Sequence, residues 1–152
     1  MTTTKIPMKL SDRTINLLKN FASINQSILF KQGSQLRTIS VMKNILAEAN
    51  IDEDFPQDFG VYDLSQFLNS LGLFQEPELN FTGESFVNIK EGKQRSKYFF
   101  ADPSVIVSPP EKSITLPTVD VEFTLRSSQL DRLLKAAGVY HLTDLSVIGD
   151  GK

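Results

Sequence analysis

The sequence predicts an α+β protein, and three observations lead to that fold class. Stretches with apolar residues at helical spacing follow good helix-capping residues. Between them stand groups of short, strand-like segments separated by turn signals. An order of strand, cap, helix, strand and glycine also recurs at an offset of 116 residues, from Ser11 to Ser127 and from Leu17 to Leu133.

Composition places the chain among soluble globular proteins and removes several functional classes. Of its 152 residues 40% are apolar and 22% charged, and no apolar run approaches the ~20 residues of a membrane span. The absence of cysteine excludes disulfides and thiolate metal sites. The first residues lack the apolar core of a signal peptide, so we expect a cytoplasmic protein. A net charge of −2 argues against a broad basic face for nucleic acid, but allows a few cations gathered on one surface.

The first helix is predicted to follow a short strand at residues 8–10. Ser11 is a good N-cap, and Asp12 suits the positive end of the helix dipole. At ~100° per residue the apolar side chains share one broad face. The opposite face is polar and contains Asp12, Arg13, Asn16, Lys19, Asn20 and Ser23.

Strands are predicted at residues 27–30, 36–41, 45–51 and 59–62, with turns at 32–34 and 43–44 and an acidic loop at 52–56. Asp63 then caps a second helix, whose Leu64, Phe67 and Leu71 face inward and which ends at Gly72. Its outward residues include no cation. Three more strands follow at 78–81, 86–89 and 97–100.

Residues 101–110 are rich in proline and are predicted to be extended and outside any sheet interior. A strand at 119–125 and a third helix starting at Ser127 or Ser128 come next. If the 116-residue offset holds, Lys152 corresponds to position 36, and the second copy stops after its second strand begins. We therefore expect the chain to be a piece of a longer product.

Six collinear blocks make the chain similar to the polymerase sliding clamps of T-even-type bacteriophages. The blocks are Met8-Lys9-Leu10-Ser11, Leu17-Leu18-Lys19-Asn20-Phe21-Ala22, Ile24-Asn25, Ala47-Glu48-Ala49-Asn50-Ile51, Tyr62-Asp63-Leu64 with Phe67-Leu68, and Ala101-Asp102-Pro103-Ser104. The resemblance implies a clamp fold, with helices lining a DNA-facing side and antiparallel sheets outside. It implies a first clamp domain at 1–104, an interdomain connector at 105–117 and an incomplete second domain at 118–152.

The resemblance also implies a function and partners. Three full-length subunits would form a ring around duplex DNA, regardless of base sequence, and tether the replicative polymerase. A clamp loader would open and close the ring, and partner peptides would dock near the connector. The expected location is the cytoplasm of the infected bacterial host.

The candidate DNA contacts are exposed polar and basic residues of two helices. They are Arg13, Asn16, Lys19 and Asn20 in the first helix, and Arg126, Arg132 and Lys135 at the third. A sliding clamp needs weak, exchangeable phosphate contacts, which such a face would supply. The alternative is an ordinary solvated helix face, which the resemblance makes less favoured.

In the connector, Val105, Ile106, Val107 and Pro109 are candidates for binding partner peptides. The alternative is a linker held on the domain by these side chains, and the two interpretations are equally supported. The basic run at 90–97 could touch DNA near the ring mouth, but a hairpin with its charges in water is favoured.

The sequence offers no set of residues that could catalyse a reaction. His141 is the single histidine and has no evident partner for a triad or metal site. Ser40 and Lys43 match a Ser-x-x-Lys pattern, but in strand-like sequence. Residues 52–54 fit an acidic turn better than a cation site. We predict a non-enzyme without metal or cofactor. The rivals are a viral adaptor that binds peptides without encircling DNA, and an enzyme of unrecognised type.

Overall fold

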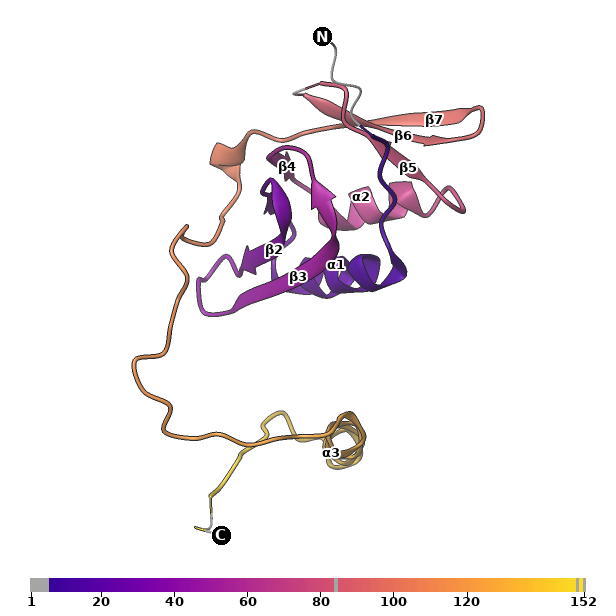
Figure 1. Cartoon of the computed structure of the whole chain (residues 1–152). Helices are drawn as coiled ribbons and strands as arrows, with labels where there is room; N and C mark the ends of the chain where they lie inside the picture. The colour runs from indigo at the N-terminus through magenta and orange to yellow at the C-terminus, as the bar shows by residue number, and fades with distance from the viewer. Residues whose placement is uncertain (1–5, 84, 150, 152) are drawn as a thin grey trace. The chain divides into compact units, whose positions relative to one another are not determined.

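Figure 1 shows the computed structural model of the chain, which describes residues 6–83, 85–149 and 151. The chain divides into two units, Met1–Lys112 and Ser113–Lys152. In the described part of the chain, the first unit contains helices α1 and α2 and strands β1 to β7, and the second contains helix α3. The α+β class predicted from the sequence is confirmed for the first unit.

Helix α1 spans Asp12–Ile24 and begins where the sequence predicts. The Ser11 hydroxyl accepts the Thr14 N–H at 3.3 Å, which satisfies one of the free donors of the first turn. At the other end Asn25 has extended backbone angles and donates its N–H to the Phe21 carbonyl. Leu18 and Phe21 are fully or almost fully buried, so the predicted apolar face packs inward.

Strands β2 (Gly33–Ile39) and β3 (Leu46–Phe55) form an antiparallel pair. Pairing is regular from Ile39 opposite Leu46 to Gln35 opposite Asn50, and then shifts so that Gly33 faces Phe55. The predicted acidic loop at 52–56 is wrong, because residues 52–55 continue β3. Two inward contacts hold this segment as strand. The Glu53 carboxylate accepts the Thr14 hydroxyl at 2.7 Å, and the Phe55 side chain is buried.

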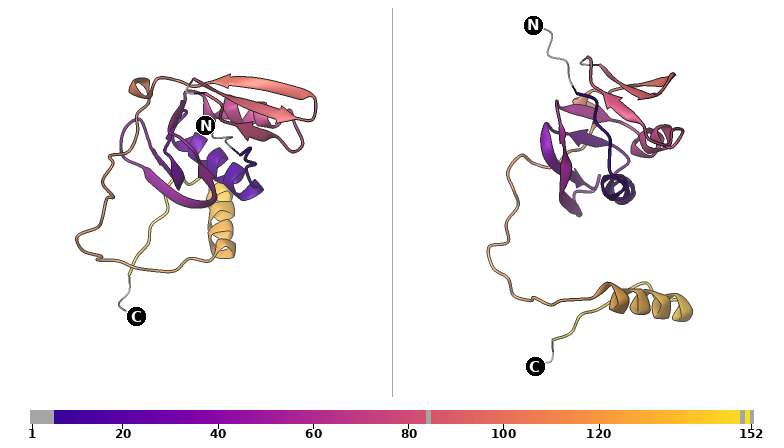
Figure 2. Two further views of the ribbon diagram at one scale, coloured as in Figure 1. Left: turned by 45° about the horizontal axis from the view of Figure 1, so that its top comes forward. Right: turned by 45° about the vertical axis from the view of Figure 1, so that its right-hand side comes forward.

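Strand β1 (Ile28–Phe30) pairs antiparallel with β4 (Phe59–Val61), which leads into helix α2 (Leu64–Leu71). The Asp63 carboxylate caps α2 by accepting the Gln66 N–H at 3.0 Å. The two helices pack against each other, and the right-hand view of Figure 2 shows both on the same side of β2 and β3. The predicted cap and the inward face of α2 are confirmed.

The third sheet has the order β5-β6-β7, with β5 at Glu78–Asn80, β6 at Phe86–Glu91 and β7 at Gln94–Phe99. The basic run at 90–97 is a β-hairpin, as favoured from the sequence. Its turn uses Gly92 at φ 56°, a left-handed conformation that glycine adopts without the steric cost of a side chain.

The first unit consists of two halves, one with α1 and β1 to β3 and one with β4, α2 and β5 to β7. The leading segment of each half pairs with a strand of the other half. Met8, ahead of α1, pairs with Leu79 in β5, whereas β4, ahead of α2, pairs with β1. Each leading segment thus joins a sheet of the other half. This exchange closes one continuous apolar core between the helices and sheets.

Phenylalanine rings occupy the centre of that core. The Phe30 ring stacks on Phe59 with centroids 4.4 Å apart and meets Phe55 and Phe67 edge-on. Such pairs contribute about 0.5–1.5 kcal/mol beyond the burial of their area. The core therefore joins β1, β3, β4 and α2, and it fixes the outward faces of the helices.

The segment after β7 follows the surface of the first unit. Ala101 pairs with Gly60, and Pro103–Val105 form a short 3-10 turn in which the Asp102 carboxylate accepts the Ser104 N–H at 2.9 Å. The sequence predicted an extended segment throughout, so the turn is a departure. Proline cannot continue a sheet, but its fixed φ suits the start of a helical turn.

In the second unit, α3 spans Ser127–Tyr140 and begins at the predicted position. The Arg126 N–H donates to the Gln129 side chain at 2.9 Å, and the helix ends at His141 with a left-handed φ of 53°. The strand predicted at 119–125 and the strand expected after the third helix are not formed in the described residues. A strand requires a hydrogen-bonding neighbour, and the described part of this unit contains none.

Candidate nucleic-acid interface and connector groove

The outer face of α1 is polar and carries the cations predicted from the sequence. Arg13, Asn16, Lys19 and Asn20 are all exposed, as are Asp12 and Ser23. Because Leu18 and Phe21 fix the opposite face in the core, the helix cannot rotate these residues away from solvent. The structure therefore brings the four candidates of the first helix onto one surface.

The two cations of α1 differ in what holds them. One guanidinium nitrogen of Arg13, Nη1, donates to the Asn50 carbonyl of β3 at 3.1 Å. Lys19 takes part in no ion pair within the described residues. Arg13 is thus a positioned charge with donors to spare, whereas no ion pair fixes the Lys19 ammonium within the described residues. Such a face can attract phosphates without holding them in one register.

The neighbouring face of α2 adds polarity but no charge. Ser65, Gln66 and Asn69 are exposed, and the Ser70 hydroxyl turns back to the Phe67 carbonyl at 2.6 Å. The three remaining candidates, Arg126, Arg132 and Lys135, are exposed in the second unit. Arg132 and Lys135 are three residues apart and so lie on the same side of α3.

The connector candidates divide into anchored and exposed residues. Ile106 is only 6% exposed and fits over Gly60, where a built Cβ would come within 2.8 Å of Ile106 Cδ1 and 2.7 Å of the Ala101 carbonyl oxygen. In this structure Ile106 therefore acts as the anchor of the connector. Val105 is 58% exposed, and Val107 and Pro109 are half-buried.

A groove of about 320 Å³ lies beside Pro109, between the connector and the β1–β2 region. Its walls are Leu29, Lys31, Gln32, Ser34, Gln35, Arg37, Ser108, Pro109 and Glu111. The walls combine an aliphatic and a proline side chain with charged and amide groups. This composition suits an extended peptide better than a small apolar molecule.

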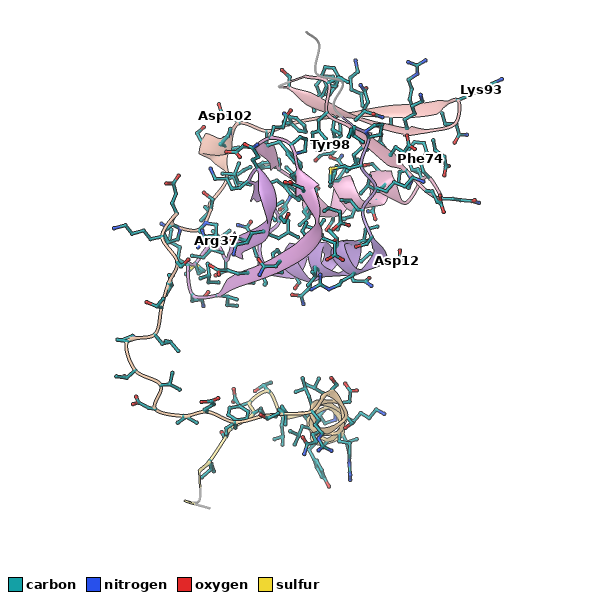
Figure 3. The ribbon with its side chains drawn as sticks, in the orientation of Figure 1. Asp12, Arg37, Phe74, Lys93, Tyr98 and Asp102 are labelled. Carbon is teal, nitrogen blue, oxygen red and sulfur yellow. The ribbon has the colours of Figure 1, made fainter. Side chains whose placement is uncertain are left out.

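Arg37 fixes one wall of this groove and is labelled in Figure 3. Its Nε donates to Glu48 at 2.9 Å and its Nη1 to the Pro110 carbonyl at 2.7 Å, so it links β2 and β3 to the connector. Its Nη2 is buried and has no hydrogen-bond partner among the described residues. The same residue therefore shapes the groove and retains one unused donor.

Asp58 holds two residues of the groove wall, Lys31 and Gln32. Its carboxylate accepts the Gln32 N–H at 2.7 Å and the Lys31 ammonium at 3.1 Å. The Gln32 hydrogen bond first, and then Lys31, keep the pKa of Asp58 below its ordinary value. The Asp58 carboxylate is therefore ionised at neutral pH and stabilises the loop between β1 and β2.

Asn25 joins the connector to the end of α1. Its buried side-chain amide donates to the Ile39 carbonyl at 2.9 Å and to the Val107 carbonyl at 3.1 Å, while its Oδ1 accepts the Ser27 N–H at 2.9 Å. Sequence reasoning identified neither this role nor that of Arg37. No local signal predicts contacts to residues 82 and 73 positions away.

The residues considered for catalysis make contacts that stabilise a turn and a helix end. The Ser40 hydroxyl accepts the N–H groups of Asn44 and Ile45 at 3.1 and 3.0 Å and so closes the β2–β3 turn. His141 is the C-cap of α3. Within the described residues there is no group of three or more acidic or histidine side chains placed to hold a metal ion. Nor does any described helix have the length and apolarity needed to span a membrane.

Comparisons with known proteins identify the family of the chain. Residues 9–108 match the family model of the DNA polymerase processivity factor. The chain is 36% identical to a sliding clamp of Vibrio phage KVP40 over 92% of its length, and 36% and 34% identical to sliding clamps of Escherichia phage RB69 and Enterobacteria phage T4 over 95%. It spans about 64% of the length of each of these relatives. The chain belongs to the DNA polymerase processivity factor family.

Proposed function

We propose that this chain supplies the front part of a sliding clamp, which encircles duplex DNA and tethers the replicative polymerase. Family membership and the sliding-clamp relatives support the assignment. The observation that carries the DNA-facing side is the outer face of α1, where Arg13 and Lys19 stand among exposed amides. Tethering raises the local concentration of the polymerase, so processivity comes from enclosure rather than from affinity.

The α1 face has the character that sliding requires. Phosphate contacts are independent of base sequence, and each released counterion adds to their salt dependence. Two cations on a helix give only a small number of such contacts, so the complex can exchange them as it moves. Arg126, Arg132 and Lys135 would add equivalent contacts from the second unit, and the low net charge of the chain fits a surface that does not grip.

The proposed organisation is a first clamp domain at 1–104, a connector at 105–117 and the beginning of a second clamp domain at 118–152. Three full-length subunits would close the ring, with a clamp loader to open it, in the cytoplasm of the infected bacterium. The uncovered apolar residues of α3 support this division: Leu133 and Leu134 are 43% and 58% exposed. They require further structure to cover them.

Partner peptides are proposed to dock at the connector groove. Val105 offers exposed apolar surface, Val107 is half-buried, and Pro109 lines the groove. Ile106 would contribute indirectly, because its burial over Gly60 holds these neighbours in place. The polymerase and the clamp loader are the proposed partners.

The test of enclosure is retention on circular DNA. The natural gene product, loaded on nicked circular duplex by a phage clamp loader, should remain bound through gel filtration and should be lost once the circle is cut. Arg13→Ala with Lys19→Ala should reduce loading several-fold while the urea-unfolding midpoint changes little, because the one hydrogen bond lost among the described residues is the exposed Arg13–Asn50 contact. Lys43→Ala, which removes an exposed cation from the β2–β3 turn, is the matched control.

Equal retention on circular and linear DNA would refute enclosure. Such a result, together with polymerase binding by the connector, would instead favour a viral adaptor that binds peptides without encircling DNA. Unchanged loading of the Arg13 and Lys19 variant would count against α1 as the DNA-facing helix. For the connector, Val105→Ser should weaken capture of the phage polymerase, whereas Val41→Ser, equally exposed but in the β2–β3 turn, should not.

A further inference from the structure

Side chains of the first unit, rather than a backbone ladder, hold the connector at residues 107–110. Within the described residues no backbone–backbone hydrogen bond reaches this stretch, and its two prolines have no N–H to donate. Asn25 donates to the Val107 carbonyl at 3.1 Å. Arg37 donates to the Pro110 carbonyl at 2.7 Å. The two residues between these ties each precede a proline and are restricted to extended backbone, so fixing both ends fixes the groove wall that the stretch supplies.

A cross-strand ion pair orients the Arg37 guanidinium toward the connector. Arg37 on β2 lies directly opposite Glu48 on β3, and its Nε donates to the Glu48 carboxylate at 2.9 Å. Nη1 of the same planar group donates to the Pro110 carbonyl, and only 17% of the Arg37 side chain is exposed. Because the donors of a guanidinium have fixed directions, the contact with Glu48 determines where Nη1 points.

We propose that Arg37, oriented by Glu48, is a positioning residue for partner docking. It holds the connector in the course that forms the groove, and it acts on the partner through that course rather than by its charge. The inference rests on the proposed docking of partner peptides at the connector groove. A connector released from Arg37 would have to be ordered during binding, so the affinity would fall with the fraction of chains in which the groove is formed.

Glu48 separates positioning from direct attraction. It does not line the groove, and within the described residues its carboxylate is paired with Arg37. If Arg37 attracted an acidic partner by its charge, removal of Glu48 would leave that charge less neutralised and would tighten binding. If Arg37 acts by position, the same removal lets the guanidinium turn away from Pro110 and weakens binding. The two roles therefore predict effects of opposite sign.

The test is fluorescence anisotropy of the 152-residue chain, labelled at its N-terminus and titrated with the phage polymerase. Arg37→Lys keeps the charge but not the forked geometry, and should weaken binding about fivefold or more. Glu48→Ala should weaken it about threefold or more. Glu76→Ala is the matched control, because it removes an ion pair of similar length, with Lys9 at 3.0 Å, and should leave the affinity unchanged.

Limited digestion reports the course of the connector without a partner. Glutamyl endopeptidase should cut after Glu111, the residue that follows Pro110, several-fold faster in Arg37→Lys and Glu48→Ala than in the wild type. The rate in Glu76→Ala should equal that of the wild type. The urea midpoint of each variant should stay close to the wild-type value, because exposed ion pairs contribute little to stability.

Wild-type affinity in Arg37→Lys or in Glu48→Ala would overturn the inference. Tighter binding by Glu48→Ala would overturn it in favour of a direct charge contact, and an equal loss in Glu76→Ala would assign the effect to ion pairs in general. Val105→Ser distinguishes these results from failure of the proposed docking. If that variant binds as the wild type does, or if the wild type binds no polymerase, both proposals fall. A weakened Val105→Ser beside wild-type affinity in Arg37→Lys removes only the role of Arg37.

Discussion

Replacing Asn25 with alanine should destabilise the first unit and release the connector from it. The side chain serves three backbone groups: the Ile39 and Val107 carbonyls and the Ser27 N–H. Each buried backbone group left without a partner costs about 1–3 kcal/mol. Water can reach the partly buried groups at Val107 and Ser27 and recover part of the loss. We therefore expect the free energy of unfolding to fall by about 2–4 kcal/mol.

The assay is equilibrium urea unfolding at neutral pH, with hydrogen exchange to locate the effect. Asn25→Ala should shift the midpoint without changing the slope, and protection should be lost first at the Ile106 N–H, which bonds to the Pro103 carbonyl at 3.1 Å. Asn25→Asp keeps an acceptor for Ser27 but removes both donors, so it should be destabilised as well. Asn69→Ala, at an exposed position of α2, is the matched control and should change stability by less than about 0.7 kcal/mol.

A fall of less than about 0.5 kcal/mol in Asn25→Ala would refute this reasoning. So would a full loss of stability in Asn25→Ala together with wild-type stability in Asn25→Asp. In that case the Ser27 contact alone would matter, and the link to the connector would be irrelevant to stability.

Three further perturbations test other parts of the fold. Partial burial raises the pKa of Glu53, but hydrogen bonds from the Ser11 N–H and the Thr14 hydroxyl outweigh it and leave that pKa below its ordinary value. The resulting stability is present above the unfolded pKa of ~4.3 and is lost as pH falls through the folded pKa, so Glu53→Gln should flatten the fall in urea midpoint measured from pH 6 to 3. Gly60→Ala should cost about 1–3 kcal/mol in urea unfolding, since its Cβ meets the Ala101 carbonyl and Ile106, whereas Gly83→Ala, with its nearest neighbour at 3.8 Å, should cost far less. Phe30→Ala should lower the free energy of unfolding by about 3–5 kcal/mol, and an equal effect from Phe99→Ala, at an exposed ring, would contradict the location of the core.

Local patterns determined the helices and the hairpin of this protein. Ser11 and Asp63 mark where α1 and α2 begin, because an N-cap bonds to an N–H only three residues ahead. The apolar spacing of α1 predicted which face is buried, and with it the exposure of Arg13 and Lys19. The Gly92 turn likewise predicted the hairpin within the run at 90–97. The α+β class follows from these elements without knowledge of their packing.

Only the tertiary structure decided what joins these elements. Glu53 was assigned to an acidic loop because its sequence neighbours are charged, yet its partner Thr14 is 39 residues away. From the sequence, Ile106 was equally a candidate for partner binding and a side chain that holds the linker on the domain, and only the missing side chain of Gly60 makes room for its burial. The predicted strand at 119–125, which did not form, also shows that tertiary contacts decide secondary structure. Its apolar pattern is strand-like, but a strand exists only where another backbone supplies the hydrogen bonds, and that condition cannot be read from a segment by itself.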